Sequence, residues 1–162
     1  MQVSIGDRLP EARFLVIGET GPQEVALAPL LAGRKVVIFG LPGAFTRTCS
    51  SAHLPSFMRA LPGLTAKGID EVICVAVNDP FVMQAWGDAT GATSAGITLL
   101  ADAGAEFTKA IGMAFTAPPA GFYDRSMRYA LMAEDGVVSV LNIEEKRVGC
   151  EISSGEAMLA QL

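Results

Sequence analysis

The sequence has a single histidine, His53, and its three cysteines include no CxxC pair. Structural zinc sites use closely spaced cysteine and histidine ligands, and metal hydrolases or Cys–His proteases need imidazoles or ligand sets that this chain lacks. An odd number of cysteines does not predict a disulfide framework either. We therefore expect neither a metal site nor a cofactor.

Positive charge is also scarce. The chain has 12 Lys and Arg residues against 17 Asp and Glu residues, a formal net charge of −5 and a pI near 4.8. Nucleic acids and anionic membrane surfaces are bound by clusters of Lys and Arg, so neither is an expected partner. Residues 1–14 carry charges and a proline where a signal peptide is apolar, and no later apolar run reaches membrane-spanning length. These features predict a soluble, cytoplasmic protein.

Long linkers, internal repeats and low-complexity tracts are absent as well. Apolar residues make up 51% of the 162 positions, which is enough for a hydrophobic core without disulfide or metal staples. We expect a single domain over residues 1–162.

Two short apolar runs predict strands that are buried on both faces of a sheet. Residues 35–41 (KVVIFGL) and 71–77 (EVICVAV) are rich in β-branched side chains. Between them, about residues 48–66 have apolar side chains at spacings of three and four, which indicates a helix. Pro55 and Pro62 should bend or break that helix.

The rest of the chain alternates between strand and helix patterns. Asn78, Asp79 and Pro80 form a helix start, because a capping side chain precedes a proline, and Ser153 or Ser154 can cap a final helix. The other expected elements are a hairpin of 13–17 and 23–27, a strand over 97–101, a helix over 103–111, and a strand pair over 129–133 and 137–143. This order predicts an α/β, thioredoxin-like fold with a mixed central β-sheet and helices on both faces.

Cys49 lies between the end of the first buried strand and the start of the following helix. Open α/β sheets keep their reactive groups at the carboxyl ends of strands. In a first helical turn, unpaired backbone N–H groups and the positive end of the helix dipole favour a thiolate over a thiol. Cys49 could therefore be a redox-active nucleophile, or simply a small buried apolar residue, and local chemistry leaves both interpretations open.

Two neighbours of Cys49 favour the redox interpretation. The Thr46 hydroxyl could accept a hydrogen bond from the thiol and donate one to a bound peroxide oxygen. Pro42 fixes the backbone and removes a donor, so it could shield the sulfur from water.

The run VVIFGLPGAFTRTCSSAHLPSF resembles the signature of type II, peroxiredoxin-five-like thiol peroxidases. In that signature a Pro, three residues, a Thr and two residues precede the peroxidatic Cys, a spacing that Pro42, Thr46 and Cys49 match. The stretches KGIDEVICVAVNDPFVMQAW and RSMRYALMAEDGVVSVLNIE resemble the same group. The resemblance implies that Cys49 reduces hydrogen peroxide and alkyl hydroperoxides and becomes a sulfenic acid.

The resemblance also assigns two arginines. Arg128 corresponds to the active-site arginine of the group, and Arg125 is a rival that could support it or face solvent. Arg47 departs from the group, which usually has Pro at this position. Its side chain either lies in solvent, which we favour, or places a further cation near the sulfur.

The sulfenic acid must then be reduced by a thiol. We rank an external thiol first, for which the resemblance implies glutathione, glutaredoxin or thioredoxin. Cys74 and Cys150 are possible resolving residues, although Cys74 lies in a strand that is apolar on both faces, where core packing is a strong alternative role.

The resemblance further implies a homodimer.

Two other functions compete with the peroxidase. A thioredoxin-like disulfide reductase needs a second cysteine near Cys49, which the sequence lacks. A non-catalytic binding or holdase protein on the same fold is the alternative from a different class.

Overall fold

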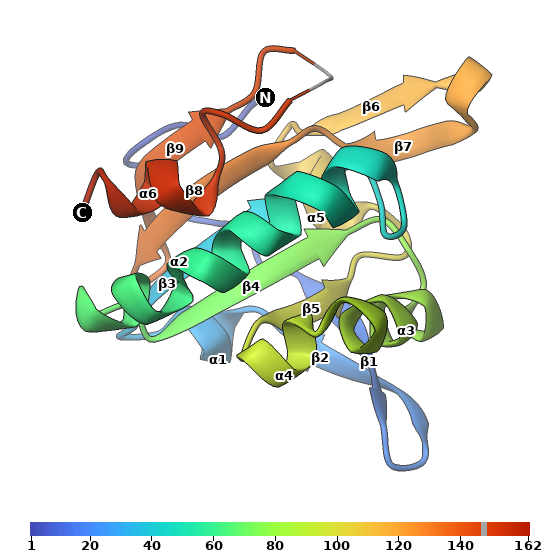
Figure 1. Cartoon of the computed structure of the whole chain (residues 1–162), viewed down its shortest axis with the longest axis horizontal. Coiled ribbons are helices and arrows are strands. Elements are labelled where there is room, and N and C mark those ends of the chain that lie inside the picture. The colour runs from blue at the N-terminus through green and yellow to red at the C-terminus, as the bar shows by residue number, and fades with distance from the viewer. Residues whose placement is uncertain (147–148) are drawn as a thin grey trace.

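A seven-stranded mixed sheet forms the centre of the protein, as the computed structural model shows for residues 1–146 and 149–162 (Figure 1). The strand order is β2-β1-β5-β4-β3-β8-β9, and a separate two-stranded sheet pairs β6 with β7. The strands are β1 (Arg13–Gly18), β2 (Gly21–Ala26), β3 (Lys35–Gly40), β4 (Glu71–Ala76), β5 (Thr98–Ala101), β6 (Ala114–Ala117), β7 (Phe122–Ser126), β8 (Tyr129–Glu134) and β9 (Val137–Ile143).

Strand β3 occupies a central position between a parallel and an antiparallel neighbour. Its Ile38 lies beside Ile73 of the parallel strand β4 and beside Leu131 of the antiparallel strand β8. Strand β5 continues the parallel part of the sheet, and the hairpin of β8 and β9 completes the opposite edge. The carboxyl end of β3 therefore lies next to the start of β8.

Helices cover both faces of this sheet. One face packs against α2 (Leu54–Ala66), α3 (Pro80–Thr90) and α6 (Gly155–Leu159), which lie in front of the sheet in Figure 1. The opposite face packs against α1 (Ala28–Leu31) and α5 (Glu106–Ala110), and the short α4 (Ala92–Ala95) follows α3. Among the described residues, no helix has both the length and the apolar character needed to cross a membrane.

The alternation of side chains along the central strands divides the core into two layers. Val37 and Phe39 of β3 join the layer under α2, whereas Val36 and Ile38 join the layer over α1 and α5. All four side chains are completely buried. The unbroken apolar run therefore reflects a strand that is covered on both faces, as the sequence predicts.

The observed mixed sheet with helices on both faces confirms the predicted α/β, thioredoxin-like class. Asp79 caps α3 as predicted, and of the two candidate serines it is Ser154 that caps α6, where its side chain accepts from Ala157 N–H. Of the two outcomes expected at Pro62, a break does not occur, because the helix continues to Ala66. The β6–β7 hairpin, with its 3₁₀ turn η2 (Pro118–Ala120), was not predicted.

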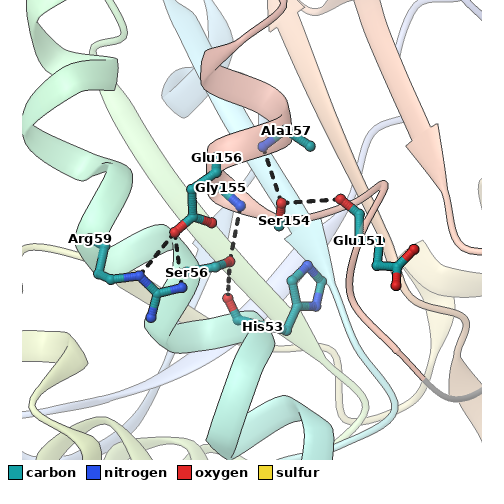
Figure 2. Close-up of polar contacts among 8 residues, drawn as sticks. All are labelled: His53, Ser56, Arg59, Glu151, Ser154, Gly155, Glu156 and Ala157. Atoms are coloured by element: carbon teal, nitrogen blue, oxygen red, sulfur yellow. Dashed lines mark hydrogen bonds and ion pairs between the residues drawn. The ribbon is translucent and has the colours of Figure 1, made fainter.

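The C-terminal helix α6 is attached to the start of α2 by polar contacts (Figure 2). The Gly155 N–H donates to Ser56 Oγ at 2.9 Å, and the Ser56 hydroxyl donates to the His53 carbonyl at 2.6 Å. At the surface, Arg59 pairs with Glu156 at 2.9 Å. The buried contacts fix the position of α6, because an exposed ion pair contributes little stability.

Replacing Gly155 should loosen this attachment. A Cβ at Gly155 would lie 2.4 Å from the Ser56 carbonyl oxygen, so α6 would have to move. We expect Gly155→Ala to lower the free energy of unfolding by about 1–3 kcal/mol, measured by urea denaturation. Gly104→Ala is the matched control, because its Cβ meets Glu106 at an ordinary 3.8 Å. Equal stabilities of the two variants would contradict the expectation.

Candidate active site

The loop that follows β3 holds the cysteine segment at the carboxyl end of the sheet. The Ala44 N–H donates to Asn78 Oδ1 at 2.9 Å, which ties this loop to the loop that follows β4. Phe45 takes a left-handed conformation with φ 62°, and its ring is 59% exposed. A bulky residue with positive φ costs free energy, so the neighbouring contacts must hold the loop in this shape.

The helix after this loop begins with a π-helical turn, η1 (Cys49–His53), in which the Leu54 N–H donates to the Cys49 carbonyl. Pro55 explains the irregular turn. It has no N–H to donate to the Ser51 carbonyl, and in a continuous α-helix its ring would collide with that carbonyl. The extra residue in the turn changes the register, so Pro55 falls in the first turn of α2, where proline is tolerated.

The Cys49 sulfur is buried and contacts Arg128. The thiol has no exposed surface, and its sulfur accepts a hydrogen bond from Arg128 Nη2 at 3.3 Å. Arg128 is only 5% exposed and directly precedes β8, whose first residue Tyr129 pairs with Gly40 at the end of β3. Antiparallel pairing of β3 and β8 thus brings together two residues that are 79 positions apart.

His53 joins this pair from the other side of the guanidinium. Its Nδ1 lies 3.1 Å from Arg128 Nη1, and its Nε2 lies 3.0 Å from the Ser153 carbonyl oxygen. A guanidinium can only donate and a carbonyl can only accept, so Nδ1 is the acceptor and Nε2 carries the proton. The contacts therefore require a neutral imidazole.

The electrostatic environment of His53 favours the same state. Burial and then the Arg128 cation lower the pKa of His53 from 6.5 to about 3, although the contact with the Ser153 carbonyl raises it somewhat. The rings of Phe39 and Phe57 lie 5.0 and 5.6 Å from the imidazole, centroid to centroid, and offer no counter-charge. His53 is consequently uncharged at neutral pH.

Thr46 and Pro42 shape the loop beside the sulfur. The Thr46 hydroxyl donates to the Gly43 carbonyl at 2.7 Å in this structure. The Pro42 carbonyl accepts a hydrogen bond from Arg125 Nη1 at 3.2 Å. Arg125 thus supports the loop, and it also stacks over the Phe122 ring at 5.4 Å from the centroid.

The other two cysteines and Arg47 differ in how far they are buried. Cys74 is completely buried in β4, and burial, with a smaller contribution from Cys49, raises its pKa well above the ordinary value. Cys150 is half-buried, and burial raises its pKa too. Arg47 is exposed, as expected for a side chain that lies in solvent.

An open cavity of about 390 Å³ lies next to the site. Pro42 and Arg128 line it on the side of the cysteine loop, and Phe115, Phe122 and Met127 give it an apolar wall. A small molecule in this cavity could contact the guanidinium that holds Cys49. Among the described residues, no cluster of three or more His, Cys, Asp or Glu side chains offers a metal site.

Comparison with known proteins identifies the family. The profile of the Redoxin family matches residues 4–159. Peroxiredoxin-2E-2, chloroplastic, of Oryza sativa subsp. japonica is 46% identical over 99% of this chain and 72% of the relative. Peroxiredoxin-2D of Arabidopsis thaliana is 39% identical over 99% of this chain and 98% of the relative. The chain belongs to the peroxiredoxins of the Redoxin family.

A solved structure gives the same result for the fold. Reduced Prx3 from Vibrio vulnificus, crystallised in complex with H₂O₂, superposes with a TM-score of 0.90 and 43% identity over 99% of each chain. The resemblance noted in the sequence is thereby confirmed, and this peroxiredoxin is a thiol peroxidase that reduces hydroperoxides through a cysteine thiolate.

The sequence predicted Cys49 and Arg128 as site residues but did not predict the position of His53 beside them. His53 was not among the predicted site residues, although its imidazole contacts the guanidinium that holds the sulfur. The usable signal was a single histidine one turn after the cysteine. The contact of Ser153 with His53 and that of Glu144 with Ser153 gave no signal, because only the tertiary fold brings these residues together.

The lowered pKa of His53 should make the protein less stable in mild acid. The unfolded imidazole takes up a proton below about pH 6.5, while the folded one stays neutral down to about pH 3. The stability from the neutral imidazole is thus complete above pH 6.5 and is lost as the pH falls through this window. Between pH 6.5 and 4, we expect His53 to contribute a slope of about 1.4 kcal/mol per pH unit in the free energy of unfolding.

Urea denaturation of wild type and His53→Asn at several pH values measures this slope. The variant keeps an acceptor for Arg128 but cannot titrate, so subtracting its curve removes the contribution of the carboxylates. If the free energy of unfolding changes with pH equally in the two proteins, the neutral state of His53 in the folded protein is contradicted.

Proposed function

We propose that Cys49 is the peroxidatic residue of this peroxiredoxin. Its thiolate attacks the terminal oxygen of a hydroperoxide, so that an S–O bond forms while the O–O bond breaks. The leaving oxygen takes up a proton and departs as water or an alcohol, and the sulfur, oxidised by two electrons, remains as a sulfenic acid. The contact between Cys49 and the buried Arg128 carries this proposal.

Arg128 stabilises the reacting charges. Its Nη2 donates to the sulfur and its Nη1 to His53, while its buried Nε has no partner among the described residues. A buried donor without a partner is costly, and a peroxide oxygen would satisfy it. Negative charge builds on the leaving oxygen during the reaction, and a fixed guanidinium beside it lowers the barrier.

Thr46 and Pro42 have supporting roles in the proposed site. The Thr46 proton is used within the loop, so its oxygen is left as an acceptor for the O–H of the hydroperoxide. Pro42 lines the cavity beside Arg128 and presents no backbone donor to the incoming peroxide.

An external thiol is the proposed reductant of the sulfenic acid. Cys74 is enclosed in the central strand β4, and to reach Cys49 the two residues would need Cα atoms within about 7 Å and matching side-chain directions. Cys150 is half-buried in the segment before α6 and is the less obstructed internal alternative. Glutathione, glutaredoxin and thioredoxin remain the candidate reductants, and the cytoplasmic location remains a prediction.

Mass spectrometry after one equivalent of hydrogen peroxide tests both proposals. With a sulfenic-acid trap, we expect one adduct at Cys49 in wild type and in a Cys74→Ser, Cys150→Ser double variant. Cys49→Ser should give no adduct and should lose peroxidase activity. A disulfide from Cys49 to either other cysteine would refute external resolution. An active Cys49→Ser protein would refute the proposed site.

We further infer a homodimer that forms through the loops at the carboxyl ends of β3 and β4. Phe45 and Phe81 are 59% and 60% exposed, and the Ala44–Asn78 hydrogen bond holds the loop of Phe45 against the loop that leads into α3, whose first turn contains Phe81. Large exposed aromatic side chains on adjacent segments are typical of a protein interface.

Analytical ultracentrifugation checks the dimer. We expect wild type to sediment as a dimer, and Phe81→Asp to shift it toward monomer by at least about tenfold in dissociation constant, as for loss of an interface anchor. Ile5→Asp is the control, because Ile5 is 64% exposed near the N-terminus. A monomeric wild type, or equal effects of both substitutions, would contradict the assignment.

A further inference from the structure

A chain of buried polar contacts connects Glu144, just after β9, to the active-site arginine. Glu144 Oε1 accepts from the Ser153 N–H at 2.9 Å and from the Ser153 hydroxyl at 3.0 Å. The Ser153 carbonyl accepts from His53 Nε2, and His53 Nδ1 accepts from Arg128 Nη1. None of these four residues is more than 8% exposed.

We propose that Glu144, acting through Ser153 and His53, positions the Arg128 guanidinium on the Cys49 sulfur. The guanidinium is planar, so a fixed acceptor at Nη1 also sets the direction of Nη2 and Nε. Without that acceptor, the guanidinium could rotate away from the sulfur. This inference rests on the role proposed above for Arg128.

The Glu144 side chain also lines the cavity beside Arg128, but its hydrogen bonds point away from a charge partner. Among the described residues its carboxylate forms no ion pair, and both of its hydrogen bonds go to Ser153. Burying a carboxylate costs free energy, and here it fixes the residue whose carbonyl holds His53. The Glu144 N–H also donates to the Arg128 carbonyl at 3.0 Å. Glu144 and Arg128, the first and last residues of this series of contacts, are therefore both attached to the β8–β9 pair.

The backbone of His53 is held independently of its ring. The contacts in Figure 2 link the His53 carbonyl to Ser56 and Ser56 to Gly155, at the N-terminus of α6. The imidazole lies beside the loop that leads into α6. With its backbone and Nε2 both fixed, the imidazole presents Nδ1 to Arg128 in a single orientation.

Variants of Glu144 separate positioning from a simple charge effect. Glu144→Ala removes the acceptor and the charge, whereas Glu144→Gln removes the charge but keeps an acceptor oxygen for Ser153. We expect Glu144→Ala to lower the rate of Cys49 oxidation by hydrogen peroxide about 10- to 100-fold, as for a misplacement near 1 Å. We expect Glu144→Gln to stay within about threefold of wild type, because it retains the geometry.

The second readout is the ionisation of Cys49, followed by thiolate absorbance in the Cys74→Ser, Cys150→Ser background. With a displaced guanidinium, we expect a smaller thiolate absorbance at neutral pH in Glu144→Ala than in Glu144→Gln. Glu151→Ala is the control, because it removes an exposed carboxylate from the same segment. If Glu144→Ala and Glu144→Gln behave alike in both readouts, positioning is refuted.

A double-mutant cycle tests whether Glu144 acts through His53. His53→Leu should reduce the oxidation rate at least as much as Glu144→Ala, and His53→Asn, which keeps an acceptor for Nη1, should recover part of the loss. Once His53 is Leu, we expect removal of the Glu144 carboxylate to change the rate by less than about threefold. Additive losses would refute the proposed route.

Arg128→Met distinguishes failure of this inference from failure of the site assignment. If Arg128→Met oxidises as fast as wild type, the role of Arg128 is wrong. If Arg128→Met is slow while folded Glu144→Ala is fast, only the positioning inference is wrong. Thermal unfolding shows whether Glu144→Ala is folded. If it is not, Ser153→Ala decides, because it removes only the hydroxyl contact, and an unchanged rate in that variant overturns the inference.

Discussion

The burial of the Arg128 guanidinium is the constraint on which the rest of the site depends. A buried cation needs partners, because it has lost its hydration. The partners that the described residues provide are the Cys49 sulfur and a neutral imidazole, and neither is a carboxylate. Only the sulfur can become an anion there. The arginine therefore gains most when the cysteine is ionised, and that is the state which attacks a peroxide.

Sheet topology explains why Arg128 and Cys49 meet. Arg128 immediately precedes β8, and β8 pairs antiparallel with β3, so the guanidinium arrives at the end of β3 where the cysteine loop begins. A parallel neighbour at the same place would have presented its opposite end. The antiparallel pairing thus places the residue that precedes β8 at the end of the sheet where the cysteine loop lies.

The local features of this arrangement could be predicted from the sequence, and the long-range ones could not. The apolar runs 35–41 and 71–77, the Asp79 cap and the strand pair 129–143 are local patterns, and each predicted element is present. The π-turn at Cys49 depends on how Pro55 is accommodated, which the sequence indicated only as a bend or break. The meeting of His53 with Ser153, 100 positions away, needs the docked α6 helix and leaves no local pattern.

Complete burial of the Cys49 sulfur imposes two different requirements on one catalytic cycle. A small hydroperoxide can reach the guanidinium through the adjoining cavity, but a second protein thiol cannot approach a sulfur with no exposed surface. Reduction by a protein therefore requires the turn Cys49–His53 to open. Because His53 is bonded to Ser153, opening the turn also strains the contact that holds the segment before α6. Under the external reduction proposed above, a tighter attachment of α6 would therefore oppose the opening of this turn.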